Sequence, residues 1–150
     1  MNRTGLSILA CLALAVTVAV PPDLAPRAAT MPAVQVPGAD ALVERFFALV
    51  RAGKSAEAVD YAFANTSIMT GRNVEKRNLA SQIDNAIALY GPIGAVELVD
   101  ETKLGSMFVK RHYIAQHREM LTRWEMILTR LDRGWAVTSL KFDDTVQNWD

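Results

Sequence analysis

Residues 120–144 read MLTRWEMILTRLDRGWAVTSLKFDD, in which two runs of alternating apolar and polar side chains flank a short polar turn. The first run covers residues 124–131, the second covers residues 135–142, and Asp-Arg-Gly at 132–134 lies between them. Alternation with a period of two is typical of half-buried strands, and glycine readily adopts the left-handed backbone of tight turns. This stretch therefore predicts a long β-hairpin.

A three-residue turn at 132–134 predicts the register of this hairpin. It pairs apolar residues with each other and opposite charges with each other, which stabilises cross-strand neighbours. A two-residue turn at Arg133 and Gly134 instead sets Glu125 against Phe142, so we expect the three-residue turn. The expected pairs are Trp124–Phe142 and Met126–Leu140 on one face, and Glu125–Lys141 and Arg123–Asp143 on the other.

The part of the chain before this hairpin changes from helical periodicity to alternation at Ile93. Three helices are expected, over residues 40–53, 55–63 and 74–90, with Asp40, Ser55 and Asn73 as their N-caps. Two further strands are expected over residues 96–102 and 108–117. The order predicts an α+β domain in which three N-terminal helices pack on a curved antiparallel sheet of about four strands.

The N-terminal segment has the layout of a secretory signal peptide. Asn2 and Arg3 precede an apolar run over residues 5–20, and a segment rich in Pro and Ala ends near Ala29. The run is shorter than the roughly 20 residues of a membrane-spanning helix, so cleavage is favoured over an uncleaved anchor. We expect a signal peptide at 1–29, a flexible linker at 30–38 and one domain at 39–150, in a periplasmic or secreted protein.

The composition argues against several classes of function. Loss of residues 1–29 removes two of the 16 basic and one of the 16 acidic residues, leaving 14 and 15, a balance unlike that of a nucleic-acid-binding protein. No basic amphipathic helix points to a membrane surface after signal cleavage. Cys11, the only cysteine, lies within the predicted signal peptide, and His112 and His117 would project to opposite faces of a regular strand. We therefore expect no metal and no cofactor.

Taken together, these features resemble the nuclear transport factor 2-like superfamily, most closely its small exported bacterial members. The resemblance covers about residues 39–144 and rests on Tyr90-Gly91-Pro92-Ile93, Arg111-His112-Tyr113, Leu121-Thr122-Arg123-Trp124 and Gly134-Trp135-Ala136-Val137. It implies a sheet bent around the helices into a cone, whose open end often holds a ligand pocket. It says little about activity, because the superfamily contains isomerases, dehydratases, epoxide hydrolases, transport adaptors and many non-catalytic domains.

The resemblance implies that one face of the sheet meets the helices through Trp124, Met126, Leu128, Leu140 and Phe142. A pocket there would have Arg111 and Tyr113 as its polar end, with Tyr90, Trp124 and Met126 around it, and would suit a small apolar or anionic ligand. The alternative is that Arg111 pairs with Glu97 or Asp84 and that the aromatic residues are core. The register of the 108–117 strand, which decides the face of Arg111, stays open.

The other face of the sheet would carry Ile127, Thr129, Leu131, Trp135 and Val137. An apolar patch of this size commonly marks an interface, so a homodimer is expected. The alternative is that the C-terminal tail, with Trp149, folds back over the patch.

Three functions remain open. The favoured one is an exported, non-catalytic domain that binds a small ligand or a protein partner. The second is a cofactor-independent isomerase or lyase, with Glu97 as the base and Tyr113 or Tyr90 as the donor to an oxyanion. The third is a purely structural dimerisation module. No serine lies in a nucleophile motif and no glycine-rich phosphate loop follows a strand, which disfavours hydrolase and nucleotide chemistry.

Overall fold

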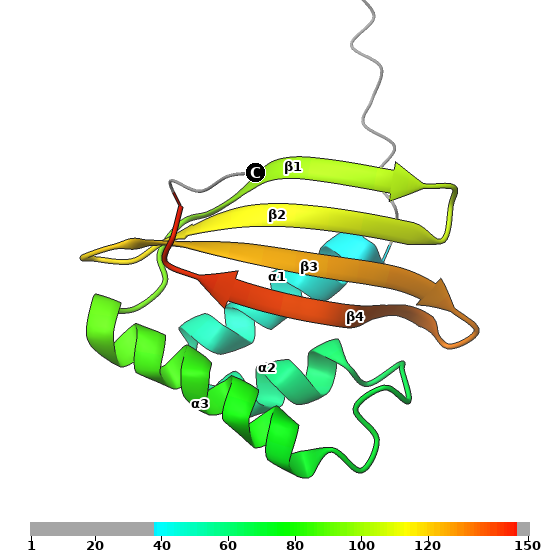
Figure 1. Cartoon of the computed structure of the whole chain (residues 1–150), viewed down its shortest axis with the longest axis horizontal. Coiled ribbons are helices and arrows are strands. Elements are labelled where there is room, and N and C mark those ends of the chain that lie inside the picture. The colour runs from blue at the N-terminus through cyan, green and yellow to red at the C-terminus, as the bar shows by residue number, and fades with distance from the viewer. Residues whose placement is uncertain (1–37, 147–150) are drawn as a thin grey trace, which may run out of the picture. The chain divides into compact units, whose positions relative to one another are not determined.

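Three helices are followed by four strands, in the order that the sequence predicts (Figure 1). The structure is a computed structural model that describes residues 38–146, which belong to one compact unit. The elements are α1 (Ala39–Arg51), α2 (Ser55–Ala62), α3 (Asn73–Tyr90), β1 (Val96–Leu104), β2 (Phe108–Gln116), β3 (Leu121–Leu131) and β4 (Gly134–Asp143). The predicted signal peptide, nearly all of the predicted linker and Trp149 lie outside the described residues.

The strands form a single antiparallel sheet in the order β1-β2-β3-β4, so β1 and β4 are its edges. The three helices lie against one face of this open sheet (Figure 1). The predicted α+β arrangement of three helices on a four-stranded antiparallel sheet is therefore confirmed. Among residues 38–146, no helix combines the length and the hydrophobicity needed to cross a membrane.

The core lies between the helices and the inner face of the sheet. Trp124 is its centre: its ring meets Phe46 and Phe47 of α1 edge-on, with centroids 5.9 and 5.3 Å apart, and stacks on Phe142 at 4.5 Å. Aromatic pairs at these distances add to the stabilisation that burial of apolar surface provides. The predicted inner set is confirmed, with Trp124, Met126 and Leu128 buried and Leu140 and Phe142 partly buried against them.

The turn between β3 and β4 is one residue shorter than the sequence predicts. Leu131 pairs with Gly134, so the loop consists of Asp132 and Arg133 alone. Gly134 has a φ of 109°, a conformation that side chains other than hydrogen strongly disfavour. The prediction of a three-residue turn at 132–134 is wrong.

A β-bulge at Thr138 offsets the short turn. Ile127 pairs with Ser139 and Leu128 pairs with Val137, which leaves Thr138 without a register partner in β3. One extra residue in β4 restores the predicted register farther from the turn. The predicted pairs are therefore all observed: Trp124–Phe142, Met126–Leu140, Glu125–Lys141 and Arg123–Asp143.

The bulge reverses the faces of the residues that lie between it and the turn, because side chains alternate along a strand. Val137 and Trp135 are buried on the helix side, with exposed fractions of 0% and 7%. The prediction that these two residues lie on the outer face is wrong. Ile127, Thr129 and Leu131 do lie on the outer face, since they alternate with the buried residues of β3.

The helix starts also differ from the prediction. None of the three helices has a side-chain hydrogen bond at its N-cap, and the N-cap residues are Gly38, Lys54 and Arg72. The predicted caps Asp40, Ser55 and Asn73 lie inside the first turn of their helices. Because the Asp40 carboxylate does not cap α1, it can bind a residue of the sheet.

Candidate ligand-binding site

The interior that was predicted to hold a pocket contains core side chains. Trp124 and Met126 are 1% and 0% exposed, and Phe46, Phe47 and Phe142 surround the Trp124 ring. Tight packing of this kind leaves little room for a ligand. The structure thus places two of the five predicted ligand contacts at the centre of the core.

Arg111 and Tyr113 lie on the helix-facing side of β2, where they stand opposite Met126 and Trp124. Both are buried, with exposed fractions of 4% and 6%. One Arg111 nitrogen, Nη1, donates to the Tyr113 hydroxyl over 3.3 Å. Burial is the largest influence on Tyr113 and raises the pKa of its hydroxyl.

Two carboxylates neutralise the buried guanidinium of Arg111. Its Nε donates to Oε2 of Glu101 over 2.6 Å, and its Nη1 lies 2.7 Å from Oδ1 of Asp40. Although burial alone would raise the pKa of Glu101, its bonds to Lys103 and Arg111 lower it overall. Pairing of Arg111 with an acid was one of the two predicted alternatives, but its partners are Glu101 and Asp40 rather than Glu97 or Asp84.

Glu97 stands on the outer face of the sheet and is exposed. A bulge in β1 after Leu98 shifts the alternation, so that Glu101 rather than the preceding residue faces Arg111. Glu97 therefore does not point toward the helices, as a base inside the cone would. Glu97 and Tyr113 lie on opposite faces of the sheet, so they cannot act together as base and donor in one cavity.

Tyr90, the last residue of α3, lies beside the C-terminal segment. Its hydroxyl donates to Oδ2 of Asp144 over 2.6 Å, and its ring centroid is 6.0 Å from that of His117. The hydrogen bond to Asp144 raises the pKa of Tyr90, because the carboxylate stabilises the protonated phenol. Tyr90 therefore holds the C-terminal segment against the end of α3.

His117 begins a buried chain of hydrogen bonds. Its Nδ1 lies 2.7 Å from the carbonyl oxygen of Gly91 and its Nε2 lies 3.0 Å from Oγ1 of Thr122, to which Trp124 Nε1 donates over 2.9 Å. A carbonyl only accepts, so Nδ1 carries a hydrogen, and in the neutral ring the Thr122 hydroxyl then donates to Nε2. Both ring nitrogens are thus occupied. Across residues 38–146, no three His, Asp or Glu side chains are grouped as a metal site requires.

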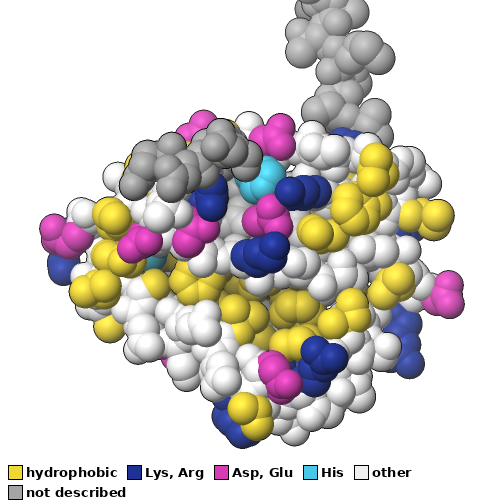
Figure 2. Space-filling view, viewed as in Figure 1, with side chains coloured by type: hydrophobic (Ala, Val, Ile, Leu, Met, Phe, Trp, Pro, Cys, Tyr) yellow, Lys and Arg dark blue, Asp and Glu magenta, His cyan; other side chains and the backbone are white. Residues whose placement is uncertain are grey.

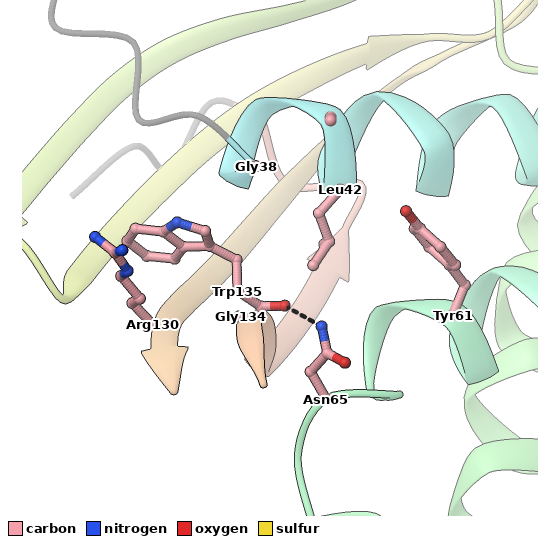
Figure 3. Close-up of a pocket in the computed structure, with 8 residues that line it drawn as sticks. Gly38, Leu42, Tyr61, Asn65, Arg130, Gly134 and Trp135 are labelled. Atoms are coloured by element: carbon pink, nitrogen blue, oxygen red, sulfur yellow. Dashed lines mark hydrogen bonds between the residues drawn. The ribbon is translucent and has the colours of Figure 1, made fainter. Parts of the chain in front are cut away.

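A hollow of about 540 Å³ lies where α1 begins and the β3–β4 hairpin turns (Figure 3). We call it the Trp135 hollow. Residues from α1, α2, the loop after α2 and the hairpin line it: Gly38, Ala41, Leu42, Tyr61, Asn65, Arg130, Gly134 and Trp135. It therefore joins segments that lie far apart in the sequence.

Trp135 is the largest side chain of this hollow, and the Thr138 bulge turns it toward α1. A Cβ on Gly38 would lie only 3.0 Å from the indole Cδ1, and the φ of Gly38 is 100°. The close approach and the backbone conformation both require glycine at this position. Trp135 and Gly38 therefore fix the start of α1 against the hairpin.

Three polar side chains reach the Trp135 hollow. Asn65 Nδ2 donates to the backbone oxygen of Trp135 over 2.9 Å, which joins the loop after α2 to β4. Arg130 lies beside Trp135, its register partner, and the Tyr61 hydroxyl points from α2 toward α1 (Figure 3). Within the described part of the chain, neither the Arg130 guanidinium nor the Tyr61 hydroxyl has a hydrogen-bond partner.

The Trp135 hollow shares several properties with small-molecule sites. Such sites enclose a few hundred Å³ between apolar and aromatic walls and carry a small number of polar groups. Among the described residues that line the Trp135 hollow there is no acid and no histidine, so it offers a surface for binding and no evident general base.

Sequence reasoning missed this site. Tyr61, Asn65 and Arg130 belong to three different segments and share no local pattern, so only the folded chain brings them together. Trp135 was noticed, but the wrong turn length placed it on the outer face. The sequence carries no signal for the two-residue loop and the bulge that together turn Trp135 inward.

Comparison of the chain with protein-family models, with curated proteins and with solved structures finds no match. We therefore infer the function from the geometry of the site.

Proposed function

We propose that this protein is a non-catalytic domain that binds a small ligand in the Trp135 hollow. The observation that carries the proposal is that Trp135, Tyr61 and Arg130 line one hollow of about 540 Å³. The Arg130 guanidinium and the Tyr61 hydroxyl, which have no hydrogen-bond partner among the described residues, are groups that a ligand could use. The Trp124 ring, by contrast, is packed against Phe46, Phe47 and Phe142.

The proposal includes export to the periplasm or the medium and a nuclear transport factor 2-like fold. The apolar N-terminal run supports export, and the order of three helices and an antiparallel meander supports the fold. A hollow between the first helix and one end of the sheet agrees with the open end of such a cone.

Native mass spectrometry of the protein purified from its own compartment tests the proposal. We expect a retained small molecule in the unmodified protein and its loss in Ala41→Phe, because Ala41 is an exposed α1 residue that lines the hollow. Ala48→Phe is the matched control, since Ala48 is exposed on the same helix and does not line the hollow. Retention of the same molecule by Ala41→Phe would place the ligand elsewhere.

We further propose that two copies of the chain associate through the outer face of the sheet. Hydrophobic side chains gather there where β1 passes into β2 (Figure 2). Leu104, Met107 and Leu131 are 66%, 63% and 39% exposed, next to the partly buried Phe108 and Ile127. Exposed apolar side chains in one area favour a protein partner, and a second copy would bury the same patch on both sides.

Light scattering on the eluting protein tests the dimer. We expect Met107→Glu to convert a dimer into a monomer, whereas Leu89→Glu, on an α3 residue that is 68% exposed, leaves the mass unchanged. A strict monomer in the unmodified protein at high concentration would refute the dimer.

A further inference from the structure

A second hollow of about 710 Å³ adjoins the Trp135 hollow at the β3–β4 turn. Asn65 and Arg130 line both hollows, so the two are neighbours, and we call them together the groove. We call the second part the arginine hollow. Its remaining walls are formed by Ala64, Thr66, Ser67, Thr70, Leu131, Asp132 and Arg133.

The two ends of this groove differ in chemistry. The Trp135 hollow is walled by an indole, a phenol and Leu42, whereas the arginine hollow has two guanidinium groups and three hydroxyls. Asp132 offsets one of the two positive charges, so the arginine hollow carries one net positive charge. A single molecule that spans both ends would need an apolar part and an anionic part.

The cations in the arginine hollow are available to a ligand. Across residues 38–146, neither Arg130 nor Arg133 forms a salt bridge, and neither does Asp132. Arg111, by contrast, is buried against two carboxylates. Unpaired arginines with a planar fork of donors recognise carboxylate and phosphate groups well.

The hydroxyls add donors on the opposite wall of the arginine hollow. Thr66 Oγ1 accepts the Ile68 backbone N–H over 3.2 Å, so its hydroxyl hydrogen remains free to donate. Ser67 and Thr70 lie in the same loop, which the Asn65–Trp135 hydrogen bond fixes to the hairpin. Residues that carry donors therefore line the arginine hollow from the loop and from the hairpin.

Resting on the proposed function, we infer that the ligand is an amphiphilic organic anion. Its apolar, planar body occupies the Trp135 hollow, and its carboxylate or phosphate group lies between Arg130, Arg133 and the loop hydroxyls. A cationic ligand would meet Arg130 wherever it lay in the groove. A neutral ligand would leave the arginine hollow unused.

Four probes separate the contributions of the two ends: 2-naphthoate, 2-naphthyl phosphate, neutral 2-naphthalenemethanol and inorganic phosphate. Each is titrated into the ¹⁵N-labelled protein, and the indole resonance of Trp135, the side-chain amide of Asn65 and the backbone amides of Ser67 and Thr70 are followed. We expect one of the naphthyl anions to shift all four groups and to bind more tightly than the neutral probe. The naphthyl anion that binds more tightly indicates whether the ligand carries a carboxylate or a phosphate group.

Arg130→Gln and Arg133→Gln test the anionic end, with Arg77→Gln on α3 as the matched control outside the groove. We expect each groove variant to raise the Kd of the naphthyl anion roughly tenfold, since a charge-assisted hydrogen bond is lost, and to leave the Kd of the neutral probe unchanged. The control should alter neither. An unchanged Trp124 indole resonance shows that the variants are folded.

If the neutral probe binds as tightly as the naphthyl anions and neither arginine variant changes the Kd, the inference of an anionic ligand is wrong. The proposal of a binding site in the Trp135 hollow would then still hold. Phosphate binding as tightly as naphthyl phosphate, without a shift at Trp135, would overturn the two-part ligand. If no probe shifts the Trp135 resonance, both the ligand class and the proposed function are wrong.

Discussion

Nη1 of Arg111 lies 2.7 Å from Oδ1 of Asp40, and this ion pair joins the first turn of α1 to the second strand of the sheet. Asp40 would cap the helix if sequence preference alone decided its role. In the folded chain, the buried guanidinium is the stronger partner because an unpaired buried charge is costly.

Removing the carboxylates around Arg111 should destabilise the protein in proportion to how many are lost. We expect Asp40→Asn to cost about 1 kcal/mol, because Glu101 still neutralises the cation. The double variant Asp40→Asn, Glu101→Gln should cost about 3–5 kcal/mol, since the buried charge then has no anion. Urea unfolding measures both. A double variant no less stable than Asp40→Asn would contradict this account.

Stability should fall in acid partly because of Glu125. Its hydrogen bond to Lys110, with further help from His112 and Lys141, holds the pKa of Glu125 at about 2, against a usual value of 4.5. A lowered carboxyl pKa stabilises the fold above the unfolded-state value, and this stabilisation is lost as the pH falls from about 4.5 toward 2. We expect a loss on the order of 1–2 kcal/mol from this residue after solvent screening.

Urea unfolding of the unmodified protein and of Glu125→Gln across this pH range tests the assignment. The free energy of unfolding of the variant should change less steeply between pH 4.5 and 2. Parallel curves would show that Glu125 does not contribute to the acid sensitivity.

The bulge predicts that two aliphatic residues of the hairpin contribute unequally to the free energy of unfolding. Val137→Ala should cost about 2 kcal/mol, because Val137 is fully buried. Ile127→Ala should cost about 1 kcal/mol or less in the monomer, because Ile127 is only partly buried on the outer face. Thermal unfolding at low protein concentration compares them. The reverse order would favour the hairpin without a bulge.

Substitution of two glycines with positive φ separates the energetic cost of a close contact from the cost of backbone strain. Gly38→Ala should cost about 2–3 kcal/mol, because its Cβ would lie 3.0 Å from Trp135 Cδ1 in addition to the strain. Gly53→Ala should cost about 1 kcal/mol, since nothing lies within 4 Å of its Cβ. Equal losses in chemical denaturation would mean that the contact with Trp135 has no energetic weight.

Ser55 provides a test of the missing caps. Its Oγ is buried and has no hydrogen-bond partner among the described residues, although the sequence predicts Ser55 as the N-cap of α2. We expect Ser55→Ala to leave the free energy of unfolding unchanged or to raise it by up to about 1 kcal/mol. A loss of about 1 kcal/mol, the usual cost of removing a cap, would show that the hydroxyl does form this bond in solution.

The order of the elements and the outer part of the hairpin register could be read from the sequence, because periodicity and charge pairing are local signals. Pairs such as Trp124–Phe142 and Glu125–Lys141 were right for this reason. The faces of Trp135 and Glu97 could not be read in this way. Each depends on a bulge, and one extra residue leaves the pattern of apolar residues almost unchanged while it reverses a face.

The candidate site was less predictable than the fold. Arg111 was recognised as a residue in need of a partner, but its partners are Asp40 of α1 and Glu101 of β1 rather than the predicted acids. Tyr61, Asn65 and Arg130 are unremarkable in their own segments, and their proximity follows from the way the loop after α2 meets the hairpin. Contacts between distant segments carry no local signature.

The Thr138 bulge also has a consequence for variation in chain length. The short turn and the bulge cancel each other in the pairing farther from the turn, so a related chain could gain one residue between Leu131 and Gly134 and lose one near Thr138 without moving Trp124 or Phe142. Only the side chains between the turn and the bulge would exchange faces of the sheet. In such a relative, the residue equivalent to Trp135 would leave the start of α1, and the hollow would lose its main wall while the core stayed intact.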